Sequence, residues 1–147
     1  MTLFDRIGED YKNAMKSRDK IRIETLRLLR SQLKDARIAK TEELNDEEEL
    51  QVISNAAKKR KEAAEAFTKA GRQELADKEM SELEIISAYL PAQLGEDEIG
   101  RMVEAAIADV GAKDIKDFGK VMGKIMPQVK GRADGGMVQQ IVRKKLA

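Results

Sequence analysis

The chain has 147 residues, with 28 Lys and Arg against 27 Asp and Glu, and a formal net charge of +1 at pH 7. It contains no Cys and no His, which excludes disulfides, thiolate or imidazole metal ligands, and Ser-His-Asp or cysteine-based catalysis. Charged residues make up 37% and aromatic residues 3%, and no apolar run approaches the ~18 residues of a membrane-spanning helix, so we expect a helix-rich soluble protein without a signal peptide.

Four helices are predicted in the first part of the chain. Thr2 precedes a run of helical periodicity as an N-cap, with Asp5 three residues later, and Asn45 with Glu48 three residues later has the pattern of a capping box. The first helix therefore starts after Thr2, and the others are expected at about 19–41, 45–70 and 73–89. The inner face of the third is rich in alanine, which lets a neighbouring helix approach closely.

Three shorter helices are predicted after Pro91, which with the residues up to Gly95 forms the best domain boundary. We therefore expect an N-terminal domain over residues 1–91 and a C-terminal domain over residues 92–147. The fifth helix runs from about residue 96 to Gly111, the sixth covers 115–126 and ends near Pro127, and Asp134 caps the last one. No segment has the period-two pattern of a strand, so the predicted fold class is all-α.

Basic residues are concentrated in two segments, although the whole chain is almost neutral. Residues 16–40 contain nine Lys or Arg and three acids, and residues 113–147 contain the same numbers, so each segment carries a net charge of +6. Such segments bind anions when their side chains share a face, and otherwise are ordinary solvated helix faces. The shorter run Lys58–Lys61 favours a solvated helix face, because it forms helical pairs with Glu62 and Glu65.

Two glycines lie one turn apart on the predicted sixth helix, and each is followed by a lysine: Gly119-Lys120 and Gly123-Lys124. A glycine inside a helix costs up to about 1 kcal/mol relative to alanine, so a compensating contact is expected. Either a neighbouring helix packs closely against this bare strip, or the backbone of a polyanionic ligand approaches it. A nucleotide-binding loop is excluded, because no strand precedes the glycines and Ile125 stands where Ser or Thr is required.

A turn at residues 130–136 leads into the last helix. Backbone N–H groups at a helix N-terminus hold phosphate readily, and Lys130 and Arg132 would add positive charge. Asp134 competes for the same N–H groups as an N-cap, so the turn is also explained by glycines that permit a tight bend. The sequence nominates no catalytic residue and no metal ligand. The candidate anion-binding residues are Gly119, Lys120, Gly123, Lys124, Lys130 and Arg132.

Several stretches along the chain share an order and spacing with a known family. They include Lys58-Lys59-Arg60-Lys61-Glu62-Ala63, Ala70-Gly71-Arg72, Tyr89-Leu90-Pro91, Gly119-Lys120-Val121-Met122-Gly123 and Lys130-Gly131-Arg132-Ala133-Asp134-Gly135. Together they resemble the GatB/YqeY family over essentially the whole chain. The resemblance implies a four-helix, YqeY-like N-terminal domain and a three-helix C-terminal domain similar to the tail of the tRNA-dependent amidotransferase B subunit. That tail helps to hold the tRNA, whereas the catalytic centres of the enzyme lie elsewhere.

The resemblance implies a non-catalytic accessory protein that binds tRNA or another structured RNA, with the candidate residues contacting phosphates. One alternative is a protein–protein interaction module that docks amidotransferase or translation components through the alanine-rich helix or the glycine strip. Another is a subunit of a carbon–nitrogen ligase with glutamine as amido donor, which is the family-level label. We expect no cofactor, no membrane partner and a cytoplasmic location.

Overall fold

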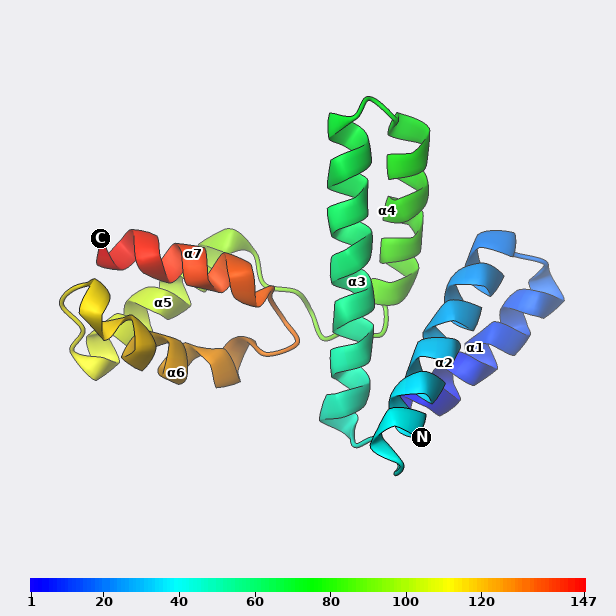
Figure 1. Ribbon diagram of the computed structural model, residues 1–147, viewed down its shortest axis with the longest axis horizontal. Coiled ribbons are helices and arrows are strands. Elements are labelled where there is room, and N and C mark those ends of the chain that lie inside the picture. The colour runs from blue at the N-terminus through cyan, green and yellow to red at the C-terminus, as the bar shows by residue number, and fades with distance from the viewer. The chain divides into compact units, whose positions relative to one another are not determined.

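The computed structural model describes residues 1–147, which form seven α-helices, one 3-10 helix and no strand (Figure 1). The predicted all-α class is confirmed. The chain consists of two compact units, which we call unit 1 (Met1–Leu90) and unit 2 (Pro91–Ala147). Unit 1 contains α1 (Leu3–Ser17), α2 (Lys20–Lys40), α3 (Asp46–Lys69) and α4 (Gln73–Ser87); unit 2 contains α5 (Glu96–Val110), η1 (Ile115–Asp117), α6 (Phe118–Val129) and α7 (Gly135–Leu146). No helix combines the length and apolar character that crossing a membrane requires.

The predicted capping box at Asn45 is present, and the predicted N-cap Thr2 also forms a capping box with Asp5. The Asp5 backbone N–H donates to the Thr2 hydroxyl oxygen at 3.1 Å, and the Glu48 backbone N–H donates to the Asn45 side-chain oxygen at 2.8 Å. In each box the acid also accepts a hydrogen bond from the backbone N–H of the capping residue. These bonds satisfy donors that the first turn of a helix otherwise leaves unpaired, and they fix where α1 and α3 begin.

Unit 1 is built from two helix pairs, α1 with α2 and α3 with α4, and α2 also packs against both helices of the second pair. Ala56, Ala57 and Ala64 of α3 are buried, as is Ala76 of α4. Their small side chains let α3 and α4 pack against each other, as the alanine-rich pattern indicates. The larger buried side chains of this core are Ile7, Leu26, Leu29, Leu33, Ile53, Ile86 and Tyr89.

A buried carboxylate of α3 caps the N-terminus of α1. Glu49 is 3% exposed, and its Oε2 accepts a hydrogen bond from the Phe4 backbone N–H at 3.0 Å. The negative charge lies at the positive end of the α1 dipole, where it stabilises the helix. This contact joins residues 45 positions apart and has no local sequence signal.

The basic run Lys58–Lys61 is not simply a solvated face, because Arg60 connects α3 to α4. The Arg60 side chain is 13% exposed, its Nε donates to Glu82 Oε2 at 2.8 Å, and Glu79 Oε2 lies 3.7 Å from the same nitrogen. Lys59 and Lys61 are exposed, as expected. One member of the run therefore holds the unit together, and its partners lie in a different helix from the predicted Glu62 and Glu65.

Unit 2 is a three-helix unit in which α5, α6 and α7 all pack against one another. Its core consists mainly of Ile and Val, contributed by all three helices. The fully buried members are Ile99, Val103, Val121, Ile125, Val129, Val138 and Val142. The segment before α5 is joined to the turn after α6, because the Leu94 backbone N–H donates to the Arg132 carbonyl oxygen at 2.8 Å.

The bounds of two helices differ from the prediction. The sixth helix does not end near Pro127, since α6 begins at Phe118, includes Pro127 and continues to Val129. Proline lacks the N–H of one helical hydrogen bond and its ring crowds the preceding turn, but the complete burial of Val129 stabilises the last turn. The fourth helix ends at Ser87, two residues early, because the N–H groups of Tyr89 and Leu90 donate to carbonyl oxygens only three residues back, at 3.0 and 3.1 Å.

Candidate functional site

The glycine strip of α6 is open. A Cβ atom placed on Gly119 or Gly123 would meet no atom within 4 Å, and both residues are exposed. Within unit 2, the expectation that a neighbouring helix packs closely against the strip is therefore wrong. The reason is the direction of the core, since Val121, Ile125 and Val129 turn the opposite side of α6 toward α5 and α7. Within the chain, nothing offsets the cost of the two glycines.

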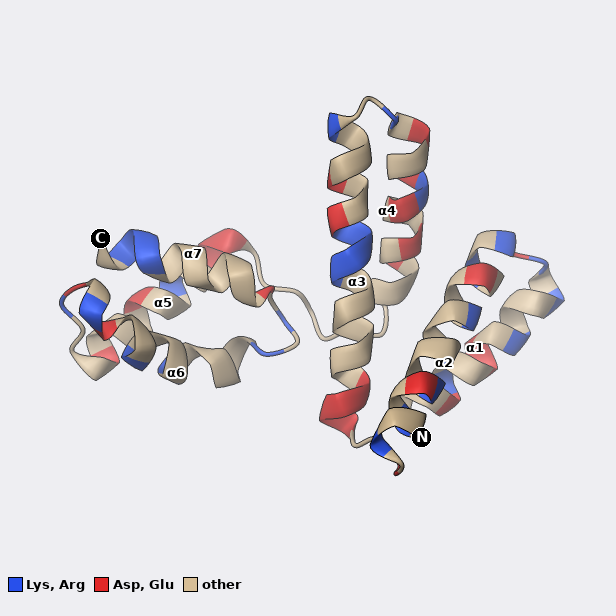
Figure 2. Ribbon diagram, in the orientation of Figure 1, with Lys and Arg blue, Asp and Glu red and all other residues tan.

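Two lysines border the strip and project into solvent. The Lys120 side chain is 72% exposed, with Nζ 3.9 Å from Asp117 Oδ1, and the Lys124 side chain is 46% exposed, with Nζ 3.1 Å from Asp109 Oδ2. Exposed pairs of this kind contribute only about 0–1 kcal/mol. A phosphate oxygen can therefore replace either carboxylate at little cost. Figure 2 shows Lys and Arg in blue on the α6 ribbon and on the turn between α6 and α7.

The carboxylate beside Lys120 is itself fixed by the backbone. Asp117 Oδ2 accepts a hydrogen bond from the Lys113 backbone N–H at 2.9 Å. This bond, together with the nearby positive charge of Lys120, holds the pKa of Asp117 below its usual range. Asp117 therefore stays charged and in place when the ammonium group of Lys120 moves to another anion.

Pro127 extends the bare strip, and the sequence reading did not include it. It is exposed and lies four residues after Gly123, so that Gly119, Gly123 and Pro127 follow one another at intervals of one turn. None of the three has a long side chain. The constant spacing of four residues from Gly119 to Pro127 indicates that Pro127 belongs to the strip. This signal is missed in the sequence, because proline is expected to end the helix.

Lys130 and Arg132 lie at the C-terminal end of α6, in the turn before α7. The backbone of both has a structural role: the Lys130 N–H donates to the Met126 carbonyl oxygen at 3.0 Å and the Arg132 N–H to that of Val129 at 2.8 Å. Lys130 is exposed and Arg132 is half-buried. At a rise of about 1.5 Å per residue, Lys120 and Lys130 are separated by roughly 15 Å along the axis of α6. All six candidate residues thus belong to α6 and its C-terminal turn.

The N-terminus of α7 is less suited to an anion. Asp134 is its N-cap, and one carboxylate oxygen accepts a hydrogen bond from the Gly136 backbone N–H at 3.3 Å. The carboxylate therefore occupies the donors that a phosphate would need. The anion-binding part of the candidate site is the α6 face and not this helix end.

The basic segment of unit 1 has a different character, because three of its arginines lie over aromatic rings of α1. The Arg30 guanidinium carbon is 5.3 Å from the ring centroid of Tyr11 and 5.6 Å from that of Phe4. Arg27 lies 5.8 Å from Tyr11, and Arg37 lies 4.9 Å from Phe4. These contacts hold α1 against α2. The sequence pattern indicated the charge of this segment but not its aromatic partners.

The chemistry available on the α6 face is the binding of anions. Lysine ammonium groups supply charge and hydrogen-bond donors, and the bare strip admits a backbone between them. No group of three or more His, Cys, Asp or Glu side chains is arranged to hold a metal ion anywhere in the structure.

Comparison with known proteins shows which family the chain belongs to. The chain is 30% identical over 131 residues to altered inheritance of mitochondria protein 41, mitochondrial, of Pyrenophora tritici-repentis, a match that covers 87% of this chain and 71% of that protein. It is also 37% identical over 79 residues to an uncharacterized protein of Schizosaccharomyces pombe, covering 54% of this chain and 64% of the relative. The family model for YqeY-like proteins matches residues 4–146. The chain therefore belongs to the YqeY-like protein family.

Proposed function

We propose that the protein is a non-catalytic accessory factor whose unit 2 binds tRNA or another structured RNA through backbone phosphates. The observation that carries the proposal is the open strip of Gly119, Gly123 and Pro127 with the exposed Lys120 and Lys124 beside it. A sugar–phosphate backbone can lie close to the helix there, and the ammonium groups can reach its phosphates. Contacts of this kind recognise the shape of an RNA and not its base sequence.

The distribution of charge within unit 2 supports the binding of RNA at the α6 face. Unit 2 contains ten Lys or Arg and eight Asp or Glu, so its net charge is small. Five of the eight acids belong to α5, whereas α6 from Phe118 to Val129 contains two lysines and no acid. A polyanion is therefore attracted to α6 more strongly than to α5. The resemblance of this part of the chain to an amidotransferase tail that holds tRNA points the same way.

The direct test is tRNA binding by fluorescence anisotropy over a range of salt concentrations. We expect the double charge reversal K120E/K124E to weaken binding strongly and to reduce the log–log salt slope by about 0.7 to 0.9 for each phosphate that the variant no longer neutralises. The matched control is K59E/K61E, which changes the net charge equally at two exposed positions of α3. Equal affinities of the two variants would overturn the proposal.

A second arm tests the glycines. G119A/G123A adds only two methyl groups, which the structure accommodates without a clash. We expect it to weaken tRNA binding while circular dichroism shows an intact helix. The control is G100A on α5, where the added Cβ would touch only the flexible end of Lys145, at 3.5 Å. If the unsubstituted protein, G119A/G123A and G100A bind tRNA equally, the RNA backbone does not approach the strip.

The alternative of a protein-interaction module is favoured by the same bare face, because small residues let a partner helix come close. Partners captured from a lysate after nuclease treatment, and absent when G119A/G123A is used as bait, would favour this alternative over RNA binding. Glutamine-dependent amide transfer by the purified chain would favour the alternative of a carbon–nitrogen ligase subunit. Cytoplasmic location and translation components as partners stay predictions.

A further inference from the structure

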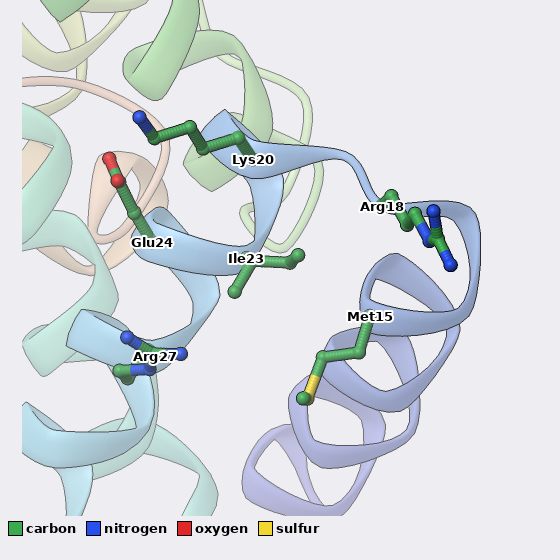
Figure 3. A pocket seen from close by; sticks show the side chains of 6 residues that line it. All are labelled: Met15, Arg18, Lys20, Ile23, Glu24 and Arg27. Atoms are coloured by element: carbon green, nitrogen blue, oxygen red, sulfur yellow. The ribbon is translucent and has the colours of Figure 1, made fainter.

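A pocket of about 310 Å³ lies in unit 1, between the C-terminal end of α1 and the N-terminal end of α2 (Figure 3). Its volume is at the lower end of the range of small-molecule sites, about 300–1,000 Å³. The six lining residues are Met15, Arg18, Lys20, Ile23, Glu24 and Arg27. Nothing in the candidate site of unit 2 involves them.

The pocket has an apolar floor. The side chains of Met15 and Ile23 lie on facing sides of the gap between α1 and α2 in Figure 3. Met15 is 51% exposed, which is unusual for a methionine beside a concave surface. An apolar chain placed between these two side chains would remove both from water, and this burial is the main source of binding energy for such a ligand.

Positive charge surrounds the floor. Three of the lining residues are cationic and Glu24 is the one carboxylate among them. Arg27 is held by Tyr11, whose hydroxyl oxygen accepts from Arg27 Nε at 3.2 Å. The side chains of Arg18 and Lys20 make no ion pair within the chain, and in Figure 3 they lie on opposite sides of the gap, with Lys20 beside Glu24 and Arg18 on the α1 side.

Arg18 has an uncommon backbone conformation for its residue type. Its φ of 58° lies in the left-handed region, which costs a non-glycine residue about 1–2 kcal/mol. Thr41 at the end of α2 has a φ of 61°, but its hydroxyl donates to the adjacent Lys40 carbonyl oxygen at 2.6 Å. Arg18 is the C-cap of α1, and its backbone N–H donates to the Met15 carbonyl oxygen at 3.3 Å, while its long cationic side chain borders the pocket.

We propose that this pocket binds an amphiphilic anion, a small molecule with an apolar chain and a carboxylate or phosphate head. The chain lies between Met15 and Ile23, and Arg18 holds the head. A nucleic acid base is a poor fit, because Arg27 and Arg30 lie over the nearby ring of Tyr11. The proposal does not depend on RNA binding by unit 2.

The test is methyl NMR of the full chain titrated with octanoate, octyl phosphate, octanol or inorganic phosphate. We expect saturable shifts of the Met15 and Ile23 methyl signals with octanoate, octyl phosphate or both, and the stronger of the two identifies the head group. Octanol and inorganic phosphate each lack half of the proposed ligand and should bind more weakly. Octanol binding as tightly as both anions, or no saturable shift at these methyl groups with either anion, overturns the proposal.

Two variants separate the charge from the backbone. R18G removes the guanidinium and suits the left-handed φ, so the fold is retained, and we expect it to weaken binding of the better anion about two- to fivefold. T41G makes the same backbone change at the end of α2 and should leave the affinity unchanged. M15Q, at an exposed position, should weaken binding about fivefold by removing apolar contact. If R18G binds the anion as tightly as T41G does, the head group is not held as proposed.

Discussion

The two units use their positive charge in different ways. In unit 1, three of the four arginines of α2 lie over aromatic rings of α1, so that guanidinium groups form part of the packing between helices. In unit 2 one arginine, Arg143, lies over a ring, that of Phe118 at 5.0 Å, and the lysines of α6 project into solvent. Two segments of equal net charge therefore have different roles. Net charge alone does not identify a binding surface, because the partners within the fold decide which cations are available.

Among the substitutions that test this comparison, the removal of Arg60 is expected to change the free energy of unfolding most. We expect R60A to lower the free energy of unfolding by about 1.5–3 kcal/mol, because Glu82 and Glu79 lose their charged partner in a half-buried position. Urea denaturation followed by circular dichroism measures the change. K59A, one residue away on the exposed side of α3, should change stability by less than about 0.5 kcal/mol. Similar losses of unfolding free energy for R60A and K59A would show that the ion pairs of Arg60 do not stabilise unit 1.

Removal of a stacked arginine should have a smaller effect. We expect R30A to cost about 1–2 kcal/mol, because its guanidinium lies over both Phe4 and Tyr11 and its methylene groups cover apolar surface. K120A in unit 2 should cost less than about 0.5 kcal/mol, since the side chain is exposed. The same denaturation measurement compares the two. A larger loss for K120A than for R30A would reverse the contrast between the units.

The open strip predicts a gain in stability. G119A and G123A should each raise the free energy of unfolding by up to about 1 kcal/mol, because alanine favours the helix and its methyl group meets no neighbouring atom. Differential scanning calorimetry of each variant would detect the higher melting temperature. A loss of stability at either position would mean that a neighbouring element covers the strip in solution.

The smallest expected effect is a pH dependence in unit 1. The Lys40 ammonium donates to Glu48 Oε1 at 2.6 Å, and this bond, followed by that from the Asn45 backbone N–H, lowers the pKa of Glu48. A lowered pKa in the folded state contributes stability above the ordinary glutamate pKa of about 4.3, and this contribution is lost as the pH falls through the folded value.

The substitution that tests this dependence is K40M. It should move the pKa of Glu48 back toward its ordinary range, which an NMR titration of the Glu48 carboxyl carbon would measure. The control is Glu104, whose pKa is lowered by Lys145 in unit 2 and should not change. An unchanged pKa of Glu48 in K40M would mean that the hydrogen bond from the Asn45 backbone N–H lowers this pKa without Lys40.

Much of the local structure could be predicted from the sequence, because its signals are local. Caps such as Thr2 and Asn45 act within one turn, and the glycine strip follows from spacing along one helix. Whether the strip is covered depends on which side of α6 meets the core, and this is a property of the tertiary fold. The same is true of Arg30 and Arg60, whose partners lie on other helices. The pocket beside Met15 could not be predicted, because it exists only where two helix ends meet.

The capping of α1 by Glu49 has a consequence for the order of folding. Glu49 lies 45 positions after Phe4, the residue whose N–H it accepts, so the first turn of α1 lacks this partner until that much more chain has been synthesised. Helix α1 is synthesised before α3, but during translation its start is completed only when α3 begins to form. Residues near the N-terminus should therefore gain protection from hydrogen exchange together with the start of α3, and not in the order in which they are translated.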